Sequence, residues 1–214
     1  MIRLSAFRSV PPFAQGLVRD LRVRWALEEA GQPYETLRIG SDDKDSPAYR
    51  AMQPFGQVPA IEDDGFTLFE SAAIVMRIAE QSDVLMPSDP DGRSRMSAWI
   101  FAALNTIEPH IQNLTTIDLF YPNEDWAKQR RPRALELVQS RLDSLAAWLK
   151  ERDYLEDRFT AADLLMTTVL RIPRHIDLVA KMPVLESYRL RCEARPAFKR
   201  ALDAQMADFE KAAA

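Results

Sequence analysis

Two short runs in the first third of the chain hold the residues whose types and spacing could do chemistry. The first run is 55–61 and the second, 69–74, follows it closely. Val58 precedes a proline, which biases the Val58 backbone to the extended region. If the bond between Val58 and Pro59 is cis, the N–H and C=O of Val58 face outward, where they can pair with the backbone of an extended peptide ligand.

The second run offers groups that could hold the charged ends of such a ligand. Ser71 could cap the helix that follows it, and the N–H groups and dipole at a helix start favour an anion. Glu70, beside it, could hold an ammonium group. A backbone segment that pairs with the ligand backbone, a group that binds its carboxylate and a group that binds its ammonium together describe a site for a γ-glutamyl peptide. The plainer alternative is a helix cap and a strand-edge proline that bind no ligand.

The run Gln57-Val58-Pro59, followed by the pair Glu70-Ser71, resembles the glutathione-binding half of the glutathione S-transferase family. The resemblance covers nearly the whole chain. It implies that Val58, before a cis Pro59, bonds the cysteinyl backbone of glutathione. It also implies that Glu70 and Ser71 grip the γ-glutamyl end, and that Gln57 reaches toward the glycyl carboxylate.

The elements that must position these residues can be read from hydrophobic spacing and turn signals. Gly31 is a natural left-handed helix exit, and Asp63-Asp64-Gly65 is a strong hairpin-turn signal. Strands are predicted at 2–7, 34–39, 58–62 and 66–69, and helical segments from about 15 to 30, at 46–52 and at 71–80. This β-α-β-α-β-β-α order predicts an α/β thioredoxin-like domain over residues 1–82, followed by a polar, turn-rich linker at 87–92.

Residues 93–214 carry only helical patterning, so an all-α C-terminal domain is predicted there. Pro109 should end or kink a long helix that starts near residue 94. Thr160 and Asp163 have the spacing of a capping box, and Phe159 can pack on Leu164 as a hydrophobic staple. The same arrangement begins the central helix of the second domain in glutathione transferases, which extends the resemblance.

Glutathione-dependent transfer needs a thiolate, and a free thiol with a pKa of about 8.5 is mostly protonated at neutral pH. The family stabilises the thiolate with a hydroxyl, or uses a cysteine, near the end of the first strand or the start of the first helix. The positions that correspond here carry neither group. Ser9 is the best remaining hydroxyl, Arg19 could act through its charge, and Ser5 comes third. Alternatively, Ser9 merely bonds a turn backbone.

The second substrate is expected against aromatic and polar residues near the first helix and in the helical domain. Such residues are equally often ordinary core. The proposed lining comprises Phe13, Asn105, Phe120, Tyr121 and Trp126.

Composition excludes several function classes. The net charge is −4 with both signs interspersed, so no nucleic-acid footprint is expected. The single cysteine, Cys192, allows no internal disulfide and fits a reducing cytosol. No signal pattern or membrane-spanning apolar run is evident, so a cytoplasmic location is expected. The two histidines, His110 and His175, lack companions at ligand spacing, so no metal site is expected.

The resemblance implies a homodimeric glutathione S-transferase that takes glutathione as co-substrate and attacks a small hydrophobic electrophile. A glutathione-dependent isomerase of the maleylacetoacetate isomerase type is one alternative, although the paired serine-and-cysteine motif of that branch is missing. A non-catalytic interaction module on the same fold is another, because this scaffold hosts several functions.

Overall fold

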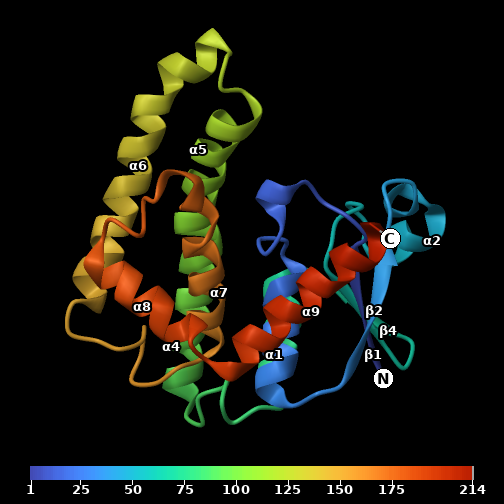
Figure 1. The fold of residues 1–214 in the computed structure, drawn as a ribbon. Coiled ribbons are helices and arrows are strands. Elements are labelled where there is room, and N and C mark those ends of the chain that lie inside the picture. The colour runs from blue at the N-terminus through green and yellow to red at the C-terminus, as the bar shows by residue number, and fades with distance from the viewer. Residues whose placement is uncertain (214) are drawn as a thin grey trace. The chain divides into compact units, whose positions relative to one another are not determined.

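The computed structural model describes the backbone of residues 1–213 and the side chains of residues 1–209. It divides into two compact units (Figure 1). The first consists of Met1–Met86 together with Ala194–Ala214, and the second of Pro87–Glu193. The last twenty or so residues, which the sequence pattern assigns to the helical domain, therefore group with the sheet-containing unit.

A four-stranded mixed sheet forms the centre of the first unit. Its strands are β1 (Ile2–Phe7), β2 (Tyr34–Ile39), β3 (Ala60–Asp63) and β4 (Phe66–Phe69), in the order β2-β1-β3-β4. β1 runs parallel to β2 and antiparallel to β3, and β3 and β4 form the predicted hairpin. Asp64 and Gly65 take positive φ values of 48° and 83° in its turn, which confirms the turn signal. β3 starts at Ala60 rather than Val58, since Pro59 has no N–H to give to a ladder.

The helices of the first unit are α1 (Asp20–Ala30), α2 (Pro47–Met52), α3 (Ser71–Ala79) and α9 (Pro196–Ala213). Two short 3₁₀ turns, η1 (Pro12–Ala14) and η2 (Asp43–Asp45), complete it. Gly31, with φ 65°, ends α1 as predicted. The helix begins at Asp20 and not near residue 15, because Gly16 adopts φ 74° and interrupts any earlier helical turn.

α1 packs against α3 on one side and α9 on another, and Figure 1 shows α9 running beside α1. Buried ionic groups hold the α1–α9 pair. Arg24, 1% exposed, donates to Asp20 at 2.8 Å and to Asp208 on α9 at 2.6 Å. Gln205 donates to Asp20 at 2.8 Å. Burial raises the pKa of Asp20, although the charge of Arg24 opposes the rise. These contacts explain why the end of the chain belongs to the first unit.

The second unit is entirely helical in its described residues. It contains α4 (Pro90–Phe101), the π-helical segment η3 (Ala102–Ile107), α5 (Glu108–Phe120), α6 (Asp125–Leu149), α7 (Ala161–Leu170), the 3₁₀ segment η4 (Ile172–Ile176) and α8 (Pro183–Glu193). The π-helical turn lies directly before Pro109, and in it the N–H of Glu108 bonds the carbonyl of Ala103. A proline cannot supply the N–H of a regular α-helical turn, so the predicted local break is confirmed.

Every residue of α7 is buried, which makes it the central helix of the second unit. Its start is the predicted capping box: the Thr160 hydroxyl accepts from the N–H of Ala162 at 3.2 Å, and Asp163 accepts from the N–H of Thr160 at 2.9 Å. Phe159 and Leu164 are both buried, as a staple requires.

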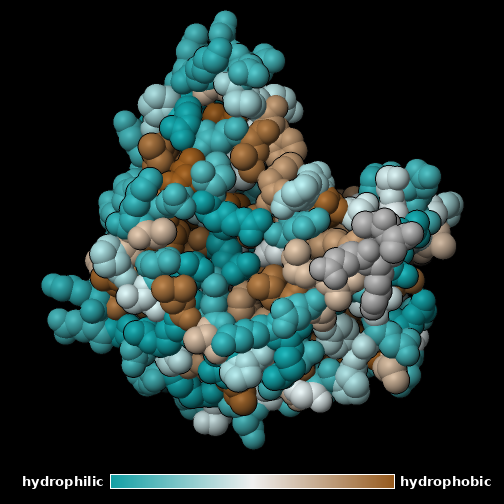
Figure 2. All heavy atoms as spheres, viewed as in Figure 1, coloured by the Kyte–Doolittle hydropathy of each residue, from teal (hydrophilic) through white to brown (hydrophobic). Residues whose placement is uncertain are grey.

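Hydrophilic residues cover most of the face in Figure 2, with smaller apolar patches between them. Within the described part of the chain, no helix combines the length and the apolar character needed to cross a membrane.

Candidate functional site

Strand pairing brings the two chemistry-bearing runs to one end of the sheet. Ala60 pairs with Phe69 in the β3–β4 hairpin, so the residues just before Ala60 and just after Phe69 lie at the same end. β1 is antiparallel to β3, with Leu4 opposite Ile61, so β1 also ends there. The topology therefore places the Val58 backbone, the pair Glu70-Ser71 and the loop after β1 at the same end of the sheet.

The backbone N–H and C=O of Val58 lie at this end and are candidates for binding a ligand. The Val58–Pro59 peptide bond is cis. The side chain of Val58 is buried with Ile39 and Tyr49 in a small apolar cluster. Among the described residues, neither the N–H nor the C=O of Val58 has a hydrogen-bond partner. Backbone groups without a hydrogen-bond partner are uncommon in a residue that is only 7% exposed, and an extended ligand backbone is one way to satisfy them.

Gln57 is held by its backbone and exposes its side chain. Its carbonyl accepts from the Tyr49 hydroxyl at 2.6 Å, and its N–H donates to the side chain of Gln53 at 3.3 Å. The exposed amide of Gln57 has no partner among the described residues, so it is available to a ligand.

Glu70 and Ser71 stand at the start of α3, but in different roles from those predicted. The interpretation of Ser71 as the capping residue is wrong, because Glu70 occupies the cap position with φ 72° and no side chain caps the helix. The Ser71 hydroxyl instead accepts from Arg22 Nη1 at 3.3 Å. The exposed Glu70 carboxylate has no partner among the described residues. The uncapped helix start keeps N–H groups available to an anion.

Arg22 was not among the sequence-predicted site residues. It lies on α1, is only 3% exposed and reaches Ser71 across 49 positions of sequence. Its positive charge adds to the field of the α3 start, which favours a carboxylate there. An arginine in a helical pattern is usually solvated, so the sequence carries no signal for this contact.

The candidates for thiolate stabilisation differ in exposure. Ser9 is exposed, lies two residues beyond β1, and its hydroxyl bonds no other described residue, so the turn-bonding alternative is not seen. Arg19 is exposed at the cap position of α1. Ser5 is fully buried in β1, and its hydroxyl is engaged with Tyr49 and Ala60. Ser5 therefore faces the interior and not the open end of the sheet.

The proposed lining of the second substrate is divided between the units. Phe13 lies in η1 of the first unit and is 43% exposed. The others belong to the second unit. Tyr121 and Trp126 contact each other with ring centroids 5.2 Å apart, and Phe120 is 60% exposed. Asn105 is exposed on the π-helical segment η3.

No group of three or more His, Cys, Asp or Glu side chains within the described residues is arranged to hold a metal ion. The groups present at this end of the sheet are the Val58 backbone, the Glu70 carboxylate, and the Ser71 hydroxyl with the Arg22 guanidinium beside it.

Comparison with known proteins agrees with this geometry. The family model for the glutathione S-transferase N-terminal domain matches residues 21–81, and the one for the C-terminal domain matches residues 110–196. A glutathione S-transferase from Hyoscyamus muticus is 30% identical over 204 residues, which covers 86% of this chain and 92% of that protein. The chain belongs to the glutathione S-transferase family. A maleylacetoacetate isomerase from Rhizobium meliloti is also 30% identical, over 84% of this chain and 89% of that protein.

A solved structure extends the comparison to the fold. A glutathione transferase from Burkholderia graminis, crystallised with two glutathione molecules bound per protein subunit, matches with a TM-score of 0.81 and 26% identity. The match covers 95% of this chain and 88% of that one. The thioredoxin-like unit with a helical unit, predicted from the sequence, is thus the architecture of the family.

Proposed function

We propose that this protein is a glutathione S-transferase that binds glutathione at the end of its sheet and directs the thiolate onto a small hydrophobic electrophile. One observation carries the proposal. The unpaired backbone of Val58 lies at the same end of the sheet as the uncapped, arginine-supported start of α3.

Each site residue has a role in this proposal. Val58, with Pro59 after it, pairs with the cysteinyl backbone of glutathione. The γ-glutamyl carboxylate is received by Ser71 and the N–H groups of α3, and the γ-glutamyl ammonium by the Glu70 carboxylate. The exposed Gln57 amide reaches the glycyl carboxylate. Hydrogen bonds to charged groups are the stronger ones, so the two ends of the tripeptide would supply most of the specificity.

Stabilisation of the thiolate is assigned to the loop between β1 and α1. Ser9 is the leading donor because its hydroxyl is exposed and free of bonds to other described residues. Arg19 is the alternative, acting by charge from the cap position of α1. A nearby donor or cation lowers the pKa of a thiol and so raises the fraction present as thiolate.

Within the second unit, the electrophile is proposed to meet the aromatic group Phe120, Tyr121 and Trp126, with Asn105 as a polar contact. The two aromatic rings already in contact, those of Tyr121 and Trp126, form a surface suited to a flat apolar molecule. A role in detoxification follows from this substrate class.

Calorimetry followed by a conjugation assay tests the proposal. Glutathione should bind with a dissociation constant between micromolar and millimolar, and a chlorinated nitroaromatic should be conjugated. Ser71→Ala should weaken glutathione binding, whereas Ser88→Ala, in the polar segment before α4, should not. Binding without turnover of any electrophile would favour the non-catalytic module, and absence of binding would refute the glutathione role altogether.

The isomerase alternative is supported by the Rhizobium meliloti relative. In that reaction glutathione adds to a cis-unsaturated acid and leaves again, so it is not consumed. Measuring free thiol during turnover of such an acid separates the two: loss of thiol indicates conjugation, and constant thiol with trans product indicates isomerisation.

We further propose a two-fold homodimer in the cytoplasm. A symmetric dimer is the commonest oligomer of soluble proteins. The single cysteine, Cys192, is buried and forms no disulfide, which suits a reducing compartment.

A further inference from the structure

Two buried hydroxyls bond the residues on either side of the Val58–Pro59 segment. The Tyr49 hydroxyl, from α2, lies 2.6 Å from the carbonyl oxygen of Gln57. The Ser5 hydroxyl, from β1, accepts from the N–H of Ala60 at 2.7 Å. The two hydroxyl oxygens are 2.8 Å apart. The residues on either side of Val58–Pro59 are thus joined to each other through Ser5 and Tyr49.

The direction of each hydrogen bond in this chain is fixed by chemistry. A carbonyl oxygen can only accept, so the single proton of the Tyr49 hydroxyl is donated to Gln57. The Ser5 hydroxyl must then donate to the Tyr49 oxygen while it accepts from Ala60. All the donors therefore point one way, from Ala60 through Ser5 and Tyr49 to Gln57. Bonds aligned in this manner strengthen one another.

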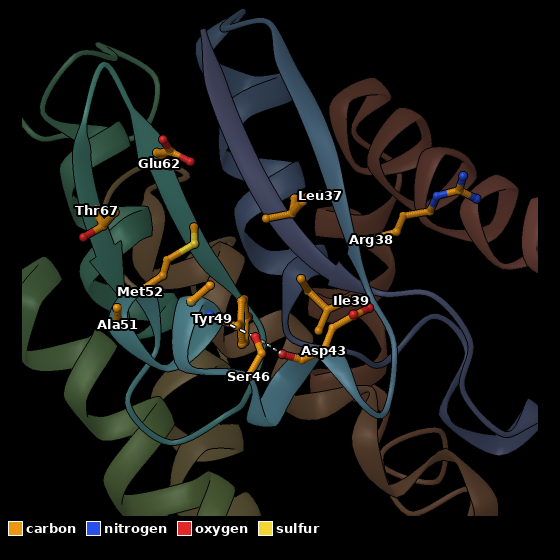
Figure 3. A pocket seen from close by; sticks show the side chains of 11 residues that line it. Leu37, Arg38, Ile39, Asp43, Ser46, Tyr49, Ala51, Met52, Glu62 and Thr67 are labelled. Carbon is orange, nitrogen blue, oxygen red and sulfur yellow. Dashed lines mark hydrogen bonds between the residues drawn. The ribbon is translucent and has the colours of Figure 1, made fainter.

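The ring of Tyr49 is itself held in place. It packs with Ile39 and with the side chain of Val58 in a buried cluster, where it is 5% exposed. Figure 3 shows it projecting from α2 beside Ile39. Both residues line a pocket of about 530 Å³ whose other lining residues come from α2, the segment before it and the sheet. Burial raises the pKa of the Tyr49 hydroxyl above its usual value of 10.0, so the donated proton is present at physiological pH.

We propose that Tyr49 and Ser5 are positioning residues for glutathione: together they fix the Gln57–Ala60 segment so that the Val58 backbone is presented to the ligand. This inference rests on the proposed function. Neither residue touches glutathione or the reacting sulfur. They determine the position of the Val58 backbone before glutathione binds. They therefore affect the affinity for glutathione and not the chemical step.

Tyr49→Phe tests the proposal cleanly because phenylalanine keeps the ring and its packing. The KM for glutathione should rise about tenfold, the factor that corresponds to one lost hydrogen bond, while kcat at saturating glutathione stays within about twofold. Tyr34→Phe is the matched control. It removes a hydroxyl from the same unit, but Tyr34 lies beside Arg24 and far along β2 from Ile39.

Ser5→Ala supplies a second variant and an independent readout. It should also raise the KM for glutathione, and it should speed amide hydrogen exchange at Ala60, whose N–H loses its acceptor. Because the two hydroxyls act in one chain, the double variant should raise KM by less than the product of the single effects. Thermal melting of each variant checks that all are folded at the assay temperature.

The outcomes separate this proposal from the proposed function. A wild-type protein that binds no glutathione removes the proposed function and this inference with it. A wild-type protein that binds glutathione, together with Tyr49→Phe and Tyr34→Phe variants of equal KM, overturns this inference alone. A fall in kcat with an unchanged KM overturns it as well, since that pattern places Tyr49 in the chemical step.

Discussion

Replacing Asp163 by asparagine should destabilise the protein through the start of its central helix. Asp163 is fully buried, and both of its carboxylate oxygens are used. One oxygen accepts from the N–H of Leu155 at 2.8 Å and from the Tyr188 hydroxyl at 3.0 Å. The other accepts from the N–H and the hydroxyl of Thr160, at 2.9 and 3.2 Å. This one side chain therefore connects the preceding loop, the start of α7 and α8.

The size of the effect follows from the donors that lose their acceptor. An asparagine amide has one oxygen, so whichever way it turns, its NH₂ faces two of the donors. Two buried donors left without an acceptor cost about 1–3 kcal/mol each. Removing a buried charge offsets part of that cost, so the net loss in the free energy of unfolding should be about 2–4 kcal/mol. Asp163→Ala, which leaves all the donors without an acceptor, should lose more.

Urea unfolding followed by tryptophan fluorescence measures the loss, because Trp99 and Trp148 both lie in the second unit and report on it. A loss of this size lowers the midpoint by about 1 M for an m value of roughly 2–3 kcal/mol/M. Asp157→Asn, at an exposed site six residues earlier, is the control and should change stability by less than about 0.5 kcal/mol. Equal midpoints for the Asp163 and Asp157 variants would refute the reasoning.

The same network predicts a pH dependence. Burial raises the pKa of Asp163 above its ordinary value of 3.8, although its hydrogen bonds oppose the rise. A carboxyl with a raised pKa in the folded state binds its proton more tightly there, so its contribution to stability is full below pH 3.8 and is lost as the pH rises through the folded pKa. The stability advantage of wild type over Asp163→Asn should therefore grow as the pH is lowered from 7 toward 3.8; a constant advantage contradicts the assignment.

Four further predictions follow, the first at the same helix start and the other three elsewhere in the molecule. Thr160→Ala should cost about 1 kcal/mol or somewhat more through loss of the helix cap, and an unchanged melting temperature would count against the cap. Arg24→Met should cost about 3–5 kcal/mol because it leaves the buried Asp20 without its cation, whereas Arg200→Ala, which breaks an exposed pair with Glu28, should cost less than about 1 kcal/mol. Ser9→Ala should lower kcat for conjugation about a hundredfold with glutathione affinity retained, and a wild-type rate would transfer the role to Arg19. Light scattering should give twice the chain mass of 24.4 kDa, and a monomer mass would exclude the dimer.

Local signals in the sequence were sufficient to predict most elements of the fold. The Asp64-Gly65 turn, the left-handed Gly31 and the Thr160–Asp163 capping box each act over a few residues, and each has the predicted conformation. The start of α1 was predicted too early, because the helical spacing continues through Gly16 although its backbone does not.

Contacts between distant segments could not be predicted in this way. Arg22 and Arg24 lie on a helix where a cation is ordinarily solvated, yet both are buried by partners 49 and 184 positions away. Asp20 and Arg24 lie one helical turn apart, a spacing that permits an ion pair but carries no information on burial. The hydrogen bonds of Ser5 and Tyr49 could not be predicted for the same reason. Their hydroxyls meet each other and the segment before β3 only once β1, α2 and that segment lie together.

A crystal structure of the protein with glutathione tests the central claim most directly. The cysteinyl backbone should pair with the N–H and C=O of Val58, and the γ-glutamyl end should lie against Glu70 and Ser71 at the start of α3. Glutathione bound elsewhere, with the Val58 backbone still unpaired, would contradict the account.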